Sequence, residues 1–154
     1  MNETIEQRLA QLGVELPTPV KAVASYVPVV RTGSTLVTSG QLPLKDGQLM
    51  ARGLLGSEVD VAQGQLAAKW CAVNVLAQAK AALGELERIR RLVKITVFVA
   101  TGPGFFEQHV VANGASDLFV TALGAKGQHA RSAVGVAALP MNAAVEVEAT
   151  FEVA

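Results

Sequence analysis

The chain has 154 residues, of which 51% are hydrophobic and 17% are charged, and its 13 lysines and arginines balance 13 aspartates and glutamates. A chain with a net charge of zero lacks the excess of basic residues with which proteins bind the phosphates of nucleic acids, so a nucleic-acid partner is disfavoured. So few charged residues leave much of a monomer's surface apolar, and we therefore expect the chain to associate with copies of itself.

The composition also bears on the compartment and the number of domains. No apolar run is long enough to span a bilayer, and the first residues lack the basic-then-apolar pattern of a signal peptide. The single cysteine, Cys71, cannot form an internal disulfide. A chain of this length is large enough for one complete core. We therefore expect a single cytoplasmic domain over residues 1–154.

The first part of the chain predicts a short helix and a hairpin. Residues 1–19 are expected to form a helix and an extended connector, because apolar side chains recur on one side of residues 2–12 and two prolines follow. Two strand-like runs at 26–31 and 35–39 flank the sequence Thr-Gly-Ser, which is typical of a tight turn. These runs are expected to pair as an antiparallel hairpin.

The middle of the chain predicts two longer helices on either side of a strand. Apolar residues recur with helical period over 61–83, and an aspartate before this segment and a glycine after it are suitable caps. Residues 89–99 alternate as a strand does. A second helix is expected over 105–123, with an interruption at Asn113 and Gly114.

Two strands complete the chain on either side of a Leu-Pro break. Residues 145–153 alternate between apolar and polar side chains, which predicts a half-buried strand. Residues 132–138 are small or β-branched and carry no charge, which predicts a strand covered on both faces. After the first helix the order is ββαβαββ. This order predicts an α+β fold in which two main helices pack on one face of a mixed sheet.

Arg131 stands at the start of the uncharged strand and raises the question of its partner. One possibility is a structural salt bridge to Glu148 or Glu152. The other is a carboxylate supplied by a ligand, which an arginine fork binds through two parallel charged hydrogen bonds. The sequence leaves both possibilities open.

The C-terminal motifs resemble the signature of the RidA/YjgF family, R-S-x-V-x-V-x-x-L-P followed by V-E-I-E. The chain reads RSAVGVAALP at 131–140 and VEVE at 145–148. The segment TSGQLP at 38–43 resembles another strand end that recurs in the family, and the resemblance covers about residues 20–154. It implies a chorismate-mutase-like α+β subunit that assembles as a homotrimer, with ligand clefts between the subunits.

The resemblance also implies a chemistry, the hydrolysis of reactive enamine and imine intermediates such as 2-aminoacrylate to 2-keto acids and ammonia. Neither a cofactor nor a metal is implied. By similarity, Arg131 anchors the carboxylate of the imino or keto acid, and Glu146 positions the attacking water. The residues that match positions lining the family's cleft are Tyr26, Ser39, Gly40 and Asn113.

Several of these residues also have an ordinary structural interpretation. Glu146 is compatible with a solvated strand position, and Tyr26 with a half-buried strand aromatic. The Ser39 hydroxyl is able to end its strand by bonding to local backbone. Asn113, with the glycine that follows it, is compatible with a simple helix irregularity.

The chain departs from the family pattern at two places. Ala133 stands where many members have a cysteine, so thiol chemistry is absent there although carboxylate anchoring is not affected. Ala24 and Ser25 stand where a Gly-Pro pair often precedes the tyrosine, which weakens the assignment of Tyr26. These differences indicate a divergent branch.

The spacing between Arg131 and Glu146 poses a geometric problem. If the last two strands formed a simple hairpin around Pro140, the two side chains would lie about 20 Å apart at the usual rise per residue. Either the strands do not pair in this way, or the two residues meet across a subunit boundary.

Two other functions fit parts of the sequence. A non-catalytic protein that binds small carboxylates, or a chaperone-like trimer, would keep Arg131 without turnover. An endoribonuclease, a label that this family often carries, would have only His109 and His129 for acid–base chemistry, and no basic or aromatic RNA surface is apparent. Two histidines and one cysteine that are widely separated make a poor metal site.

Overall fold

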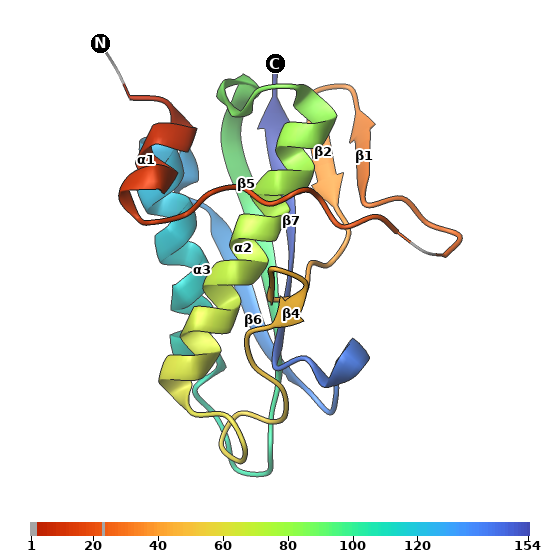
Figure 1. Ribbon diagram of the computed structural model, residues 1–154, viewed down its shortest axis with the longest axis vertical. Helices are drawn as coiled ribbons and strands as arrows, with labels where there is room; N and C mark the ends of the chain where they lie inside the picture. Colours follow the sequence, from red (N-terminus) through yellow and green to blue (C-terminus); the bar gives the residue numbers. More distant parts are fainter. Residues whose placement is uncertain (1–2, 23) are drawn as a thin grey trace.

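The computed structural model describes residues 3–22 and 24–154, and it contains a mixed β-sheet with helices on one face (Figure 1). The elements in chain order are α1 (Ile5–Gln11), β1 (Val29–Thr32), β2 (Thr35–Thr38), β3 (Leu44–Lys45), β4 (Gln48–Leu49), α2 (Val61–Leu83), η1 (Leu86–Arg88), β5 (Ile89–Ala100), α3 (Gln108–Leu123), η2 (Gly124–Gly127), β6 (Ala130–Val136), η3 (Pro140–Asn142) and β7 (Val145–Val153). Within these described ranges, none of the helices has both the length and the apolar composition that a membrane crossing requires.

The main sheet has five strands in the order β1-β2-β7-β5-β6. β5 and β6 run parallel, and the other neighbouring pairs are antiparallel. The helices α1, α2 and α3 lie on the same side of this sheet in Figure 1. The predicted α+β class, with the two main helices on one face of a mixed sheet, is confirmed.

The alternation of side chains along β5 and β7 separates the two faces of the sheet. Val97 of β5 pairs with Val147 of β7, and both are fully buried beneath the helices. The next pair, Phe98 and Glu146, is only partly buried and projects to the face that no helix covers. Successive strand residues point to opposite faces, so this register decides where each functional side chain emerges.

Some predicted boundaries move in the structure. The first helix begins at Ile5, and the predicted start at Asn2 lies outside the described residues. β1 begins only at Val29, after Pro28, which lacks the N–H that a ladder needs. The second long helix begins at Gln108, three residues later than predicted. The small β3–β4 hairpin was not predicted, because strands of two residues carry no periodicity.

The prediction that residues 132–138 form a strand covered on both faces is wrong. β6 covers 130–136 and is the last strand of the sheet, so among the described strands none lies beside one of its backbone edges. Val134 pairs with Phe98 on the face that no described helix covers, and its side chain is 42% exposed, so β6 is not covered on both faces. An uncharged, partly apolar edge strand readily pairs or packs with another chain.

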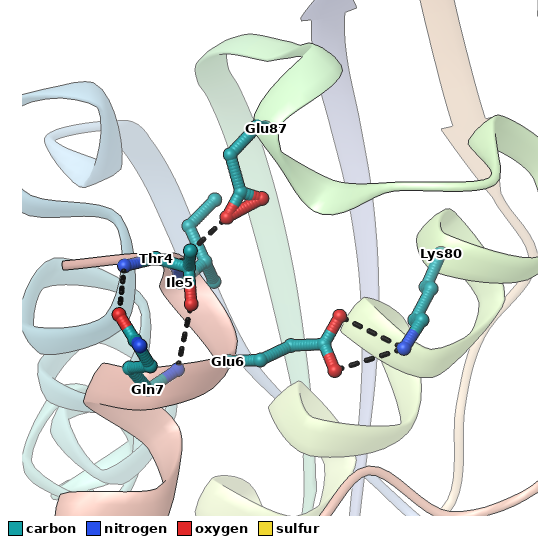
Figure 2. A network of polar contacts seen from close by, with 6 residues as sticks. All are labelled: Thr4, Ile5, Glu6, Gln7, Lys80 and Glu87. Atoms are coloured by element: carbon teal, nitrogen blue, oxygen red, sulfur yellow. Dashed lines mark hydrogen bonds and ion pairs between the residues drawn. The ribbon is translucent and has the colours of Figure 1, made fainter.

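α1 has a capping box at its start and contacts the rest of the fold through polar groups, which Figure 2 shows, and through its apolar side. The hydroxyl of Thr4 accepts from the backbone N–H of Gln7, and the Gln7 side chain accepts from the backbone N–H of Thr4. The first N–H of the helix donates to Glu87 over 3.0 Å. The Glu6–Lys80 ion pair, at 2.8 Å, is solvent-exposed at both ends and therefore contributes little. Burial of the apolar side of α1 supplies most of the attachment.

The predicted interruption of the second long helix at Asn113 and Gly114 is also wrong, because α3 is continuous from Gln108 to Leu123. The glycine has a packing role instead. A Cβ at Gly114 would lie 2.7 Å from the carbonyl carbon of Gln65 in α2, so the two helices approach each other backbone to backbone. This close approach sets the position of α3, which carries part of the candidate site.

We expect Gly114→Ala to lower the free energy of unfolding by at least about 2 kcal/mol, because the backbone of α2 cannot move aside as a flexible side chain can. The measurement is urea unfolding followed by circular dichroism. Thr121→Ala, at an exposed position of the same helix, is the matched control and is expected to change the stability by less than about 0.5 kcal/mol. Equal stability of the Gly114→Ala variant and the wild type would contradict this account of the helix contact.

Candidate functional site

Arg131 is the second residue of β6, and its side chain points toward α3. It pairs in register with Ile95 of β5, which is buried on the helix face, so the guanidinium emerges on that face. Its Nη1 donates to Asn113 Oδ1 over 2.8 Å and to Ser116 Oγ over 3.1 Å. Its Nη2 donates to the backbone carbonyl of His109 over 3.2 Å. The guanidinium is therefore oriented by three acceptors that are all neutral.

The structural salt bridge that the sequence left open for Arg131 is not formed. In the part of the chain that the structure describes, no carboxylate lies within 4.0 Å of this guanidinium. Glu148 pairs with Thr96 and Glu152 with Arg91, on β7 positions that face the uncovered side of the sheet. They point away from the helix face to which Arg131 projects.

Glu146 lies on the uncovered face of the sheet, where β7 passes the end of β2. Burial is the main cause that raises the pKa of its carboxyl above the ordinary value, and the nearby charge of Glu148 adds to the effect. A Cβ at Gly40 would overlap the Glu146 carboxyl, so only glycine lets the carboxyl lie against this backbone. The structure thus brings Gly40 and Glu146 together.

Tyr26 and Ser39 lie on the same side of the molecule as Gly40. The Ser39 hydroxyl donates to the carbonyl of Val27 over 2.8 Å, as expected if it fixes the end of its strand. Tyr26, which is 56% exposed, lines a cavity of about 90 Å³ together with Gly40 and Gln41. This side of the site is therefore a small hollow between the connector and the end of β2.

Two buried amides of α2 fix the segment that follows Gly40. Asn74 donates to the carbonyls of Leu42 and Leu44 over 3.2 and 2.8 Å. Gln78 donates to the side-chain oxygen of Gln41 over 3.3 Å. Sequence analysis did not identify these amides, although two polar residues four apart within the otherwise apolar stretch 70–79 of the helix are a usable signal.

Within one chain the predicted site residues form two separate groups. Arg131 and Asn113 lie together at the β6–α3 side, whereas Tyr26, Ser39, Gly40 and Glu146 lie near β2 and β7. β5 separates β6 from β7, so the last two strands do not pair as a hairpin. This was the first of the two alternatives that the spacing of Arg131 and Glu146 left open. Arg131 registers with Ile95 and Glu146 with Phe98, which places their side chains on opposite faces of the sheet. A single chain does not join them.

Two further residues that the sequence analysis did not assign to the site, Ser116 and His129, lie beside Arg131. The Ser116 Oγ and His129 Nε2 atoms are 2.9 Å apart, and His129 Nδ1 is bonded to the carbonyl of Gly127. A cavity of about 300 Å³ is lined by Ser116, Val120, Gln128, His129 and Arg131. The spacing of Ser116 three residues after Asn113 on a helix could have indicated that both share one face.

No resident metal site is evident from the side chains. Across residues 3–22 and 24–154, no three of the histidine, cysteine, aspartate and glutamate side chains come together in a group that could hold a metal ion. Cys71 is fully buried within α2, and burial raises the pKa of its thiol well above the ordinary value.

Comparisons with known proteins agree with this architecture. The family model described as "YjgF/chorismate mutase-like, putative endoribonuclease" matches residues 6–152. The chain belongs to the RidA/YjgF family. Its α+β subunit is accordingly of the chorismate-mutase-like kind.

Three relatives indicate how the chain stands within the RidA/YjgF family. Protein TCP17 of Trypanosoma cruzi is 48% identical over 96% of this chain and 93% of its own length. The crystal structure of Atu1372 from Agrobacterium tumefaciens, a protein of unknown function, is 53% identical, covers 97% of this chain and 92% of its own, and has a TM-score of 0.93. TdcF of Escherichia coli with bound serine is 27% identical, covers 99% of this chain and 100% of its own, and has a TM-score of 0.65.

The raised pKa of Glu146 has a consequence for stability. A carboxyl that binds its proton more tightly in the folded state lowers the free energy of unfolding when it must ionise. This loss grows as the pH rises from the ordinary glutamate pKa through the pKa of the folded state. Glu146→Gln removes this cost. We therefore expect the melting temperature of Glu146→Gln to exceed that of the wild type by about 1–3 °C at pH 7. The gain is expected to vanish below pH 4, where glutamate is protonated in both states.

The measurement is thermal unfolding of both proteins at several pH values. Glu107→Gln, at an exposed position before α3, is the control and is expected to show no such dependence. A Glu146→Gln variant that is less stable than the wild type at pH 7 would contradict the inference that burial destabilises this carboxylate.

Proposed function

We propose that this protein hydrolyses reactive enamines and 2-imino acids of the 2-aminoacrylate type to 2-keto acids and ammonia. We further propose that it does so in clefts between the subunits of a homotrimer. The observation that carries the proposal is the state of Arg131. Its guanidinium is held in place by neutral groups alone, and its positive charge is left for a ligand.

The donor count at Arg131 supports a carboxylate ligand. A guanidinium has five N–H donors. Three of them are used by Asn113, Ser116 and the carbonyl of His109, so that two donors remain. A carboxylate is bound well by two neighbouring N–H donors of one guanidinium, because its two oxygens accept two parallel hydrogen bonds. The serine bound to TdcF is an amino acid, which supports a ligand of this class for the present chain as well.

Glu146 is suited to act on the attacking water. Because burial raises its pKa, it is a better proton acceptor near neutral pH than an exposed glutamate would be. Water adds its oxygen to the carbon of the protonated imine and gives one proton to Glu146, so that a carbinolamine forms. Glu146 then returns this proton to the nitrogen. The C–N bond breaks as the carbinolamine hydroxyl loses its proton to solvent and becomes the C=O group, so that ammonia and the 2-keto acid leave. Arg131 contributes by holding the carboxylate, so that the imine carbon stays in place.

The separation of Arg131 and Glu146 within one chain supports a site built from two chains. Arg131 lies at the edge strand β6, and Glu146 lies on the uncovered face of the sheet. The edge and the face are the two surfaces that the fold leaves open, and the uncovered face also carries the exposed side chains of Val37 and Val134. Contact between neighbouring copies would cover both surfaces and bring the two residues to one cleft.

The activity is tested by measuring the release of ammonia and 2-keto acid from imines that an amino-acid oxidase generates in situ. We expect the wild type to accelerate this release and Arg131→Ala to lose about 100-fold in kcat/KM, because a charge-assisted pair contributes up to about 3 kcal/mol. Arg90→Ala, an exposed arginine on β5, is the matched control. A wild type without acceleration on any imine would favour the alternative, a non-catalytic binder of small carboxylates.

The two-chain site is tested by mixing two inactive variants. Arg131→Ala and Glu146→Gln are unfolded together, refolded at equal amounts and compared with each variant refolded alone. If each cleft takes Arg131 from one copy and Glu146 from its neighbour, random assembly restores about one quarter of the clefts. We therefore expect about a quarter of the wild-type activity, together with a trimer mass by light scattering. Absence of any recovery, with trimers present, would place both residues of a cleft on the same chain.

A further inference from the structure

A buried glutamine of α2 connects two segments that lie apart in the chain. Gln78 is 2% exposed, and its Nε2 donates to the backbone carbonyl of Val20 over 2.7 Å and to Gln41 Oε1 over 3.3 Å. Gln41 in turn donates from its own Nε2 to the carbonyl of Ser39 over 3.2 Å. A carboxamide nitrogen has two hydrogens. Both hydrogens of Gln78 are therefore used to join the connector before β1 to the segment that follows β2.

The connector is attached to the same segment at a second place. The Ser39 hydroxyl donates to the carbonyl of Val27 over 2.8 Å, and the backbone N–H of Ser39 donates to the carbonyl of Pro28 over 2.8 Å. Tyr26 lies between the two attachments in the chain. The first attachment depends on one side chain of α2, whereas the second comes from the strand end itself.

The two attached segments are walls of the cavity of about 90 Å³ beside Tyr26. One of them, which we call the connector wall, consists of Val20, Lys21, Ala22 and Tyr26. The other includes Gln41 and Gly40, against whose backbone the Glu146 carboxyl lies. Gln78 bonds to one residue of each wall from beneath and does not line the cavity.

We propose that Gln78 is a positioning residue that holds the connector wall close to Gly40 and thereby determines how tightly the site binds a 2-imino or 2-keto acid. This inference rests on the function proposed above. Without the hydrogen bonds of Gln78, the connector wall loses one of its two attachments and opens more often. Only the closed wall presents Tyr26 to a ligand, so a larger open fraction weakens binding.

A role in core stability alone makes a different prediction. In that case, replacement of Gln78 lowers the free energy of unfolding of the whole domain and leaves the ligand affinity of the folded protein unchanged. If Gln78 holds the connector wall, the wall opens locally at temperatures where the domain stays folded. Lys21 belongs to this wall and is exposed, and trypsin cleaves after lysine, so the cleavage rate at Lys21 reports the opening.

The first experiment follows tryptic cleavage after Lys21 by mass spectrometry in the native wild type and in Gln78→Met. Methionine keeps the volume of the side chain but donates no hydrogen bond. We expect cleavage to be about fivefold faster in Gln78→Met, because two hydrogen bonds that close the wall are lost. Gln65→Met is the matched control in the same helix. Gln65 donates to the carbonyl of Val110 in α3 instead, so its replacement is expected to leave the rate at Lys21 unchanged.

The second experiment measures binding, both in the oxidase-coupled imine assay and by titration calorimetry with pyruvate, the 2-keto acid that 2-aminoacrylate yields. We expect the KM and the dissociation constant of pyruvate to rise about fivefold in Gln78→Met, with kcat within about twofold of the wild type because Arg131 and Glu146 are unchanged. Ser39→Ala removes the hydroxyl bond to Val27 and is expected to act in the same direction without a change in the core.

The outcomes separate this inference from the function on which it rests. If cleavage after Lys21 and the affinity for pyruvate both stay within about twofold of the wild type in Gln78→Met, the inference is overturned. A change in only one of the two quantities overturns it as well, because an open wall exposes Lys21 and weakens binding at the same time. A wild type that binds pyruvate without hydrolysing imines would refute the proposed reaction and leave the role of Gln78 in place. If the wild type does neither, both proposals fail. Circular dichroism verifies that each variant is folded.

Discussion

The central position of β5 is the constraint on which the rest of this structure depends. This strand pairs in parallel with β6 on one side and antiparallel with β7 on the other. β6 and β7 follow each other in the chain, yet β5 keeps them apart. The register on β5 also sends Arg131 to the helix face and Glu146 to the uncovered face. Two residues fifteen positions apart thereby become parts of two different surfaces.

The way in which Arg131 is held explains how a charge can be both fixed and available. A carboxylate partner would have oriented the guanidinium but would also have neutralised it. The amide of Asn113, the hydroxyl of Ser116 and the carbonyl of His109 orient it through hydrogen bonds and leave the charge uncompensated. Two of these groups come from side chains of α3, so the packing of α3 against α2 at Gly114 determines the geometry of the anchor. A packing contact between helix backbones is in this way connected to the geometry of the proposed ligand site.

The surfaces that the fold leaves uncovered lead to the same expectation as the composition, namely contact with other chains. A chain with half of its residues hydrophobic buries one face of its sheet under helices and keeps the other face uncovered. The edge of β6 has no strand beside it. Neither feature suits an isolated monomer, because apolar faces and free strand edges attract other chains. Glu146 lies on the uncovered face and Arg131 lies on the edge strand, which is the reason for proposing a cleft between subunits.

The sequence by itself determined the elements whose signals are local. The alternation along 145–153, the helical period of 61–83 and the aspartate cap before that helix each depend on neighbours a few residues away. All three were identified correctly. The motif around Arg131 likewise identified the family, because it is a contiguous pattern. The conformation of Gly114 was misjudged, since a glycine in a helix looks the same whether it breaks the helix or admits a neighbouring backbone.

Only the tertiary structure decided which strand lies beside which, which face each side chain takes and which residues surround Arg131. A small, uncharged strand such as β6 has the same sequence signature at the centre of a sheet as at its edge. Ser116 and His129 have no local pattern that indicates a shared site, because thirteen residues and a turn separate them. Pairing and register arise from contacts between distant segments, and such contacts minimise the energy of the whole fold without leaving a periodic trace in any one segment.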